Sequence, residues 1–393
     1  MTSRPLVVLS LEGLATSALG CYGSSWNKTP ALDAIASTGC VWDRWLATSD
    51  DPNATFRHVT DGLQSTPSWE SHWRRQGSIE LITDVREVSD QFEQSPFEQL
   101  VSLHDRGSRS ARPAEDIVDT QLGQLVAAAI QRDAEEAPWS VLWLHSGFLT
   151  HHWDAPRFLS LIEEGDPYDL EPSEEVDLLE ENPDVTEQLE NLPPVFSETL
   201  PPKIELGDDD HPDLVTSWMR TYGCQIRLID VLLEILLTSL KAEDPYIAIL
   251  GTSGFQLGQN GWIGHQQGPL RSPEIRLPMI VSDVGPLHLP HLTRSSTLPK
   301  IVEDLARDSQ QGPDPSLLWS PEQWCQPEKE SEVVTKSNRA QRAVTTPEWF
   351  FVQDSDASEH LFLKPDDTED FNNVSRLRAD IVEKFDSEKF DSA

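Results

Sequence analysis

The feature that most constrains the fold of this chain is a series of short apolar runs, each followed by polar residues or glycine. The runs span 6–11, 79–82, 140–144, 246–250 and 278–281. Continuous apolar runs of this length are typical of strands buried on both faces of a parallel sheet. Three of them lead into similar polar loops, at 12–13, 145–147 and 252–254. Because open α/β sheets bind ligands where the strands end, we expect these loops to converge on one site.

Amphipathic segments between the apolar runs predict helices at 29–36, 116–132 and 218–240. The first begins with Thr29-Pro30, an N-cap residue followed by proline at the first helical position. Apolar residues in the other two recur at helical spacing, which indicates packing on a core. The fold class that follows is α/β, with a mostly parallel central sheet sandwiched by helices.

The strand–helix alternation defines a main domain over 1–305 and weakens after it. Residues 306–341 are rich in Pro, Gln, Ser and charge, so we expect a connector there. Strand character returns at 349–352 and 360–363, and a charged helix is expected near 374–385. Residues 342–393 are therefore predicted to form a small C-terminal α+β subdomain.

Segment 161–213 of the main domain has a different composition, with 19 Asp and Glu residues against one Lys, about half of the net charge of the chain. Prolines interrupt it, and we expect an exposed acidic insertion. A calcium-binding loop and a docking surface for a basic partner are the alternatives for this segment. The acidic triplet at 208–210 is too compact for an EF-hand loop.

The formal net charge of −37 disfavours nucleic acid and anionic membranes as partners. It also disfavours long-range attraction of a dianionic ligand. No run approaches the ~20 apolar residues that cross a bilayer, and the first apolar run is short for a signal peptide. We expect a cytoplasmic protein that binds a protein or a small-molecule ligand, which the sequence does not identify.

Several motifs occur in a fixed order along the chain. The strand at 6–11 is followed by Leu-Gly-Cys-Tyr-Gly at 19–23, Thr-Pro-Ala-Leu-Asp at 29–33 and Ala-Thr-Ser at 47–49. Further motifs lie at 143–145, 153–156, 257–261, 276–281 and 342–349. This series resembles the sulfatases, within the alkaline-phosphatase superfamily. The resemblance implies the sulfatase fold and the activity of a sulfuric ester hydrolase.

The resemblance also implies a formylglycine nucleophile made from Cys-x-Pro-x-Arg, a divalent cation, usually calcium, and basic residues that hold the sulfate. The segment 47–49 is instead followed by Asp50 and Asp51, with neither Cys nor Arg at the motif spacing. The expected Thr-Ser-Asp-His-Gly is shortened to Thr-Ser-Gly at 252–254, which removes an acidic metal ligand. Asp84 stands where a sulfate-binding Lys is expected.

The remaining candidates would form a vestigial pocket, and no catalytic residue is assigned. Glu12 is a weak candidate for a metal ligand, because it falls where an Asp is expected and its side chain is longer. His265 lies near the position of the last basic residue of the family. The other pocket candidates are Asp50, Asp51, His145, His151 and His152.

These departures favour a catalytically degenerate sulfatase-like protein, a pseudo-sulfatase, that acts by binding. No cofactor is expected, or Ca²⁺ if a metal site survives. One alternative is an active sulfuric or phosphoric ester hydrolase with a rebuilt site, in which Thr48 or Ser49 could supply a hydroxyl nucleophile. The other is an acidic calcium- or partner-binding module on a sulfatase scaffold.

Overall fold

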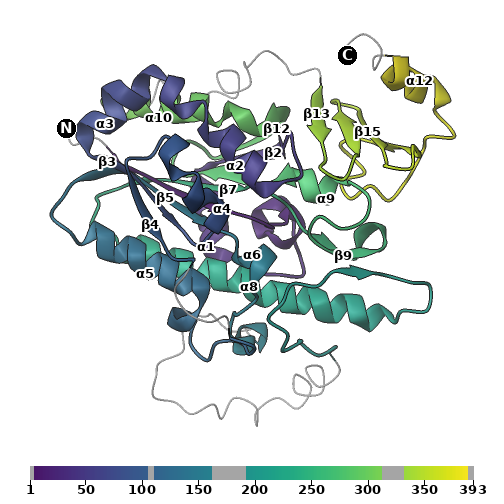
Figure 1. The fold of residues 1–393 in the computed structure, drawn as a ribbon, viewed down its shortest axis with the longest axis horizontal. Coiled ribbons are helices and arrows are strands. Elements are labelled where there is room, and N and C mark those ends of the chain that lie inside the picture. The colour runs from purple at the N-terminus through teal and green to yellow at the C-terminus, as the bar shows by residue number, and fades with distance from the viewer. Residues whose placement is uncertain (1–3, 105–109, 162–191, 312–331, 388–393) are drawn as a thin grey trace.

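The computed structural model describes residues 4–104, 110–161, 192–311 and 332–387 (Figure 1). Within these ranges, nine strands form a central sheet in the order β10-β2-β11-β7-β1-β5-β3-β4, and β12 pairs with β2. The strands are β1 Leu6–Leu11, β2 Cys40–Leu46, β3 Ser78–Thr83, β4 Gln99–Ser102, β5 Trp139–Ser146, β7 Tyr246–Gly251, β10 Arg276–Leu277, β11 Met279–Val281 and β12 Leu287–Arg294.

Five neighbouring strands, β7, β1, β5, β3 and β4, run parallel to one another. Their register brings the carboxyl ends of β1, β5 and β7 together, since Leu11 pairs with Ser146 on one side and Gly251 on the other. This confirms the predicted α/β fold with a mostly parallel sheet. It also places the loops at 12–13, 145–147 and 252–254 at one edge of that sheet.

The direction predicted for the last apolar run is wrong. Residues 279–281 form strand β11, but it runs antiparallel to β7 and β2. A parallel return needs a crossover, usually a long helix. The chain between β7 and β11 contains no long helix: it has the short helix α9, Ser272–Ile275, a single 3-10 turn at 259–261 and the short strands β8, β9 and β10.

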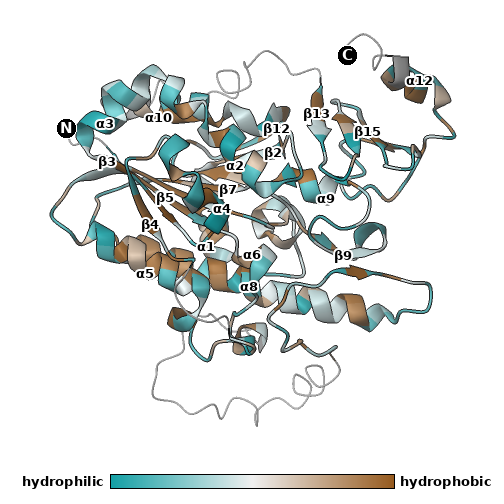
Figure 2. Cartoon of the chain, in the orientation of Figure 1, coloured by the Kyte–Doolittle hydropathy of each residue, from teal (hydrophilic) through white to brown (hydrophobic). Residues whose placement is uncertain are grey.

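Helices cover both faces of the sheet (Figure 1). One layer contains α1 Pro30–Thr38, α5 Gln121–Asp133 and α8 Pro212–Ser239, which confirms the three predicted helices. The other contains α2 Pro52–Thr60 and α10 Leu298–Gln311. Because side chains alternate along a strand, Val7 and Leu9 of β1 pack in the first layer, and Leu6 and Val8 in the second. In Figure 2 the central strands are largely apolar, whereas the helices that cover them carry both apolar and polar residues.

A second sheet is antiparallel, in the order β13-β14-β15-β16, with β13 Val333–Lys336, β14 Arg342–Thr345, β15 Trp349–Gln353 and β16 Glu359–Leu363. Helix α12, Ala379–Ser387, packs on it through stacked rings of Phe351 and Phe385. Both β13 and the end of α10 fall in the range predicted as connector. The rest of that range, 312–331, lies outside the described residues.

A small third sheet pairs β6 Ile204–Glu205 with β9 Trp262–Gly264, and β9 with β8 Gln256–Leu257. Strand β6 belongs to the predicted acidic insertion, whose residues 162–191 lie outside the described ranges. The described end of the insertion packs on the main domain, since Thr199 is buried and its carbonyl accepts a hydrogen bond from Trp153 N at 2.7 Å. It is therefore more than an exposed excursion.

None of the helices among the described residues is long and apolar enough to cross a membrane.

Candidate functional site

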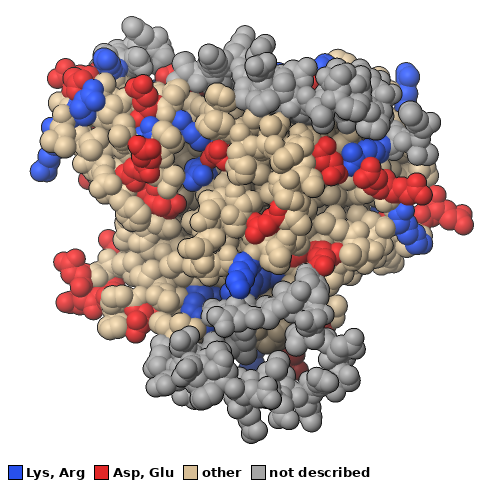
Figure 3. Space-filling view, turned by 180° about the vertical axis from the view of Figure 1, so that it is seen from behind, with Lys and Arg blue, Asp and Glu red and all other residues tan. Residues whose placement is uncertain are grey.

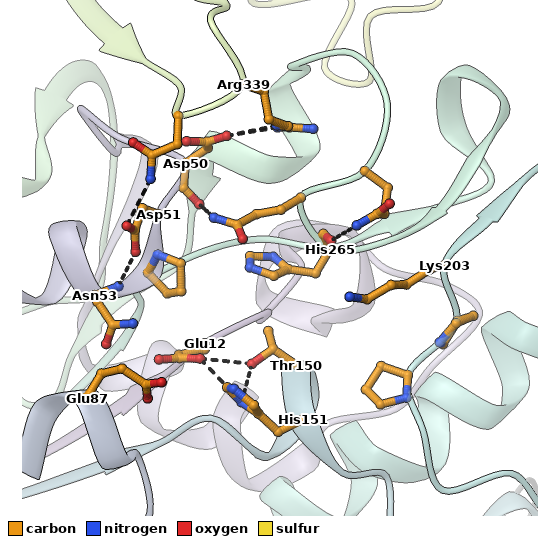
Figure 4. Close-up of a pocket in the computed structure, with 16 residues that line it drawn as sticks. Glu12, Asp50, Asp51, Asn53, Glu87, Thr150, His151, Lys203, His265 and Arg339 are labelled. Carbon is orange, nitrogen blue, oxygen red and sulfur yellow. Dashed lines mark hydrogen bonds and ion pairs between the residues drawn. The ribbon is translucent and has the colours of Figure 1, made fainter.

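A cavity of about 480 Å³ opens at the carboxyl edge of the parallel strands (Figure 4). Segments far apart in the sequence line it: the loop after β1, the turn after β5, the start of α2, the loop after β9 and the turn between β13 and β14. The lining residues are Glu12, Asp50, Asp51, Pro52, Asn53, Glu87, Thr150, His151, Pro201, Pro202, Lys203, His265, Gln266, Gln267, Asn338 and Arg339. Of the three loops predicted to converge, the one at 12–13 lines the cavity through Glu12, whereas residues 145–147 and 252–254 do not line it.

Glu12 follows β1 and is 1% exposed. Its Oε2 accepts a hydrogen bond from Thr150 Oγ1 at 2.8 Å and lies 3.7 Å from His151 Nδ1, while its Oε1 lies 3.6 Å from His145 Nε2. Burial raises the pKa of Glu12, but the hydrogen bonds and charges of these three neighbours outweigh it and lower the pKa. Glu12 is therefore an ionised carboxylate at neutral pH, and the protein itself supplies its partners.

Gly13 allows the chain to turn tightly after Glu12. Its φ is +78°, and a Cβ there would lie 2.8 Å from Thr150 Cγ2. Its backbone N donates to Ser253 Oγ at 2.9 Å. The shortened loop at 252–254 therefore closes directly against the loop that carries Glu12.

Of the four candidate histidines, His151 and His265 line the cavity. His151 ends the short helix α6, Phe148–His151, whereas His152 is buried and does not line the cavity. His145 is fully buried next to Glu12, and its Nδ1 lies 2.8 Å from Ser10 Oγ. Burial lowers the pKa of His265 to about 4, so its ring is neutral at pH 7.

Asp51 lines the cavity and caps helix α2. Its Oδ1 accepts hydrogen bonds from Asn53 N at 2.9 Å and Ala54 N at 3.3 Å, and Pro52 occupies the first helical position. This is the usual start of a helix, so the sequence Asp51-Pro52 has a structural reason. The adjacent Asp50 is 2% exposed and accepts hydrogen bonds from Arg339 Nη2 at 2.9 Å and Ser337 Oγ at 2.6 Å.

Arg339 lines the cavity and is paired with Glu274, which does not line it, and no sequence motif indicated either residue. Arg339 Nη2 lies 3.0 Å from Glu274 Oε2 as well as 2.9 Å from Asp50 Oδ2. Glu274 is 2% exposed, and burial raises its pKa to about 7 against the opposing effect of Arg339. These three residues are distant in the sequence, and only the tertiary fold brings them together.

Lys203 is a second cation that sequence reasoning missed. It lies in the predicted acidic insertion, just before β6, and its amine points into the cavity in Figure 4. It is exposed and makes no ion pair with a described residue. The carboxylates that line the cavity, Glu12, Asp50, Asp51 and Glu87, outnumber its two cations, and Arg339 is already paired. The cavity is therefore a poor environment for a dianion.

Three further residues from the sequence analysis do not line the cavity. Asp84 is buried and accepts hydrogen bonds from Ser146 Oγ at 2.5 Å and Gly147 N at 2.9 Å, so it holds the turn after β5. Asp84 therefore contributes no carboxylate to the lining of the cavity. Ser49 Oγ accepts from Asp51 N at 3.1 Å, and Thr48 Oγ1 lies 2.9 Å from His58 Nδ1.

The acids near the cavity do not fit the calcium site that the resemblance implies. Calcium takes six or more oxygen ligands, several of them carboxylate. Over the residues that the structure describes, no group of three or more His, Cys, Asp and Glu is placed to hold a metal ion. Glu12 is already bound by Thr150, and Asp50 by Arg339.

Glu274→Gln is expected to make the protein more stable above pH 7 and to change little at pH 5. The folded-state pKa of Glu274 is raised from 4.5 to about 7. Its contribution to stability is therefore present at low pH and is lost as the pH rises through this window. Glutamine mimics the protonated acid, so the gain at pH 8 should reach about 2–3 kcal/mol.

Urea unfolding at pH 5 and pH 8 measures this difference. The exposed Glu243→Gln serves as the matched control and should show no such pH-dependent gain. A Glu274→Gln variant that is equally destabilised at both pH values would show that the ionised carboxylate stabilises the fold.

No protein-family model and no curated protein sequence matches the chain. Solved structures match it over nearly its whole length. A 2-O GAG sulfatase shares 11% identity, covering 99% of this chain and 91% of its own, with a TM-score of 0.65. The phosphonate monoester hydrolase of Agrobacterium radiobacter shares 14% identity, covering 99% and 96%, with a TM-score of 0.60. A protein in complex with its substrate D-glucosamine-2-N,6-O-disulfate shares 12%, covering 98% and 96%, with a TM-score of 0.61.

These similarities confirm the predicted fold. The chain has the fold of sulfatases and phosphonate monoester hydrolases of the alkaline-phosphatase superfamily, at very low sequence identity.

Proposed function

We propose that this chain uses the sulfatase fold to bind a small polar ligand and no longer hydrolyses sulfate esters. The pairing of Asp50 with Arg339 carries the proposal. By resemblance, the nucleophile should follow the segment 47–49, and Asp50 stands there. Its carboxylate is buried and bound by a guanidinium and a hydroxyl. The side chain at this position therefore has a structural role, as one partner of a buried ion pair.

Charge supports binding of something other than a sulfate dianion. Four carboxylates line the cavity, and Lys203 is its one cation without an ion pair among the described residues. The surface charge supports the same conclusion. On the face drawn in Figure 3, Lys and Arg side chains lie in small groups among acidic ones and form no continuous basic surface. A neutral or singly charged ligand with hydroxyl or amide groups suits the lining of Asn, Gln, Thr and neutral His.

An ester hydrolase with a rebuilt site is the second candidate, favoured by the group around Glu12. Thr150 Oγ1 faces the cavity between Glu12 Oε2 and His151 Nδ1, at 2.8 and 2.9 Å. A hydroxyl beside a carboxylate and a histidine can act as an activated nucleophile. This candidate requires Thr150 in place of Thr48 or Ser49, which do not line the cavity.

A turnover assay separates the two candidates. We expect no hydrolysis of 4-nitrophenyl sulfate or 4-nitrophenyl phosphate above the uncatalysed rate, with or without Ca²⁺ or Mg²⁺, and no difference between the wild type and Glu12→Gln. A rate that Glu12→Gln or Thr150→Val abolishes, while Glu243→Gln preserves it, would overturn the proposal in favour of the rebuilt hydrolase.

A further inference from the structure

The turn between β13 and β14 inserts a cation into the wall of the cavity. The hairpin closes through Ser337 N and Gln341 O at 3.0 Å, and Ala340 adopts a positive φ of 58° at its tip. Strand β13 is hydrogen-bonded to the segment before Asp50, since Lys336 N donates to Thr48 O at 3.0 Å. The hairpin is therefore held in a fixed position beside Asp50 and presents Arg339 to it.

The Arg339 guanidinium donates hydrogen bonds to oxygen atoms of this wall and of its own hairpin. Nε and Nη2 donate to Asp50 Oδ2 at 3.1 and 2.9 Å, Nη2 donates to Glu274 Oε2 at 3.0 Å, and Nη1 donates to Gly268 O at 2.7 Å. Nε is also 3.3 Å from Ser337 Oγ. Two carboxylates, a carbonyl and a hydroxyl around one positive charge form the kind of oxygen shell that a hard divalent cation takes.

Removal of Arg339 would leave two buried carboxyl groups without their cation. The side chains of Asp50 and Glu274 are 1% and 2% exposed, and their second oxygens, Oδ1 and Oε1, are buried without a hydrogen-bond partner. Buried carboxylates need a cation or a proton. In this wall the hairpin supplies the cation.

We infer that Arg339 is a resident cation, which compensates the buried carboxylates of Asp50 and Glu274 in place of a bound metal ion. The cavity wall is thereby complete without an exchangeable ion. Asn338 Nδ2 also donates to Asp51 Oδ2 at 3.1 Å, so the same hairpin holds the start of α2. The inference does not depend on whether the cavity hydrolyses an ester, because it concerns cation binding and not turnover.

Calcium titration at pH 8 by isothermal titration calorimetry tests the inference, with Ca²⁺ alone as the probe. Arg339→Ala leaves the oxygens of Asp50, Glu274 and Gly268 around a vacated volume, where water can complete the shell. We expect this variant to bind one calcium ion with a Kd at least about tenfold lower than any binding by the wild type. The double variant Arg339→Ala with Glu274→Gln should lose most of the calcium affinity that Arg339→Ala gains.

Guanidinium gives a second readout that does not involve metal. Millimolar guanidinium chloride, far below denaturing concentrations, should raise the Tm of Arg339→Ala by refilling the vacated place. It should not raise the Tm of the wild type. Lys203→Ala is the matched control, since it removes another cation that lines the cavity, and it should show neither calcium binding nor a guanidinium effect.

Arg339→Lys keeps the positive charge, and it provides the test of the inference if Arg339→Ala does not fold. It should fold with a lower Tm than the wild type and bind no calcium. Tight calcium binding by the wild type or by Arg339→Lys would overturn the inference. So would a folded Arg339→Ala variant that gains neither calcium binding nor stabilisation by guanidinium.

Discussion

Replacement of Trp153 with alanine is expected to destabilise the protein by about 3–5 kcal/mol, the range found when a large buried aromatic side chain is removed. Trp153 is fully buried, and its ring lies 5.4 Å from that of Phe255 and 5.7 Å from that of Tyr222, centroid to centroid. Its Nε1 donates to Leu149 O at 2.7 Å. The substitution would remove this hydrogen bond and leave a cavity in the core.

The substitution of Trp153 should disturb the candidate site as well as the core. Leu149 belongs to α6, which also carries Thr150 and His151, so Trp153 anchors one wall of the cavity. Tyr222 packs on Trp153, and its hydroxyl donates to Gly13 O at 2.7 Å and accepts from Ala15 N at 2.9 Å. The same aromatic cluster therefore supports both the wall with His151 and the loop with Glu12.

Urea unfolding followed by far-UV circular dichroism measures this effect. Trp153→Phe is the matched control, because it keeps an aromatic ring and loses only part of the volume and the indole N–H. It should cost clearly less than the alanine variant. A loss below about 1 kcal/mol for Trp153→Ala would mean that the core repacks around the gap.

The sequence predicts the fold well because the determinants of the fold are local. Apolar runs buried on both faces give β1, β3, β5 and β7, and the N-cap and proline of Thr29-Pro30 give the start of α1. The loops that follow such strands must meet at one edge of the sheet. That requirement is enough to place Glu12 near His151 without any knowledge of side-chain geometry.

The chemistry of the site is less predictable, because it depends on contacts between distant segments. Arg339 comes from a range predicted as connector and Lys203 from a range predicted as an exposed insertion. Neither shows any local pattern, since a single cation that the tertiary fold brings to the cavity leaves no periodicity in the sequence. The histidine pair illustrates a second limit. The end of α6 decides which of His151 and His152 faces the cavity, and helix ends are uncertain by one or two residues.

Arg132→Ala is expected to cost about 3–5 kcal/mol of stability, since it leaves the buried carboxylate of Glu80 without its cation. The side chains of Arg132 and Glu80 are 8% and 2% exposed. Their contact is bidentate, with Arg132 Nε 2.7 Å from Glu80 Oε2 and Nη2 2.6 Å from Oε1. The pair joins α5 to β3, and neither residue lines the cavity.

The double variant Arg132→Met with Glu80→Leu should cost much less than Arg132→Ala, because apolar side chains of similar size need no compensation for lost hydration. Urea unfolding of Arg132→Met, Glu80→Leu and the double variant gives the coupling between the positions. A double variant as unstable as the sum of the single variants would show that the ion pair itself adds little. Since the pair lies away from the cavity, Arg132→Ala also serves as a reference for Arg339→Ala. Both remove a cation from buried carboxylates, but only the loss of Arg339 should create calcium binding.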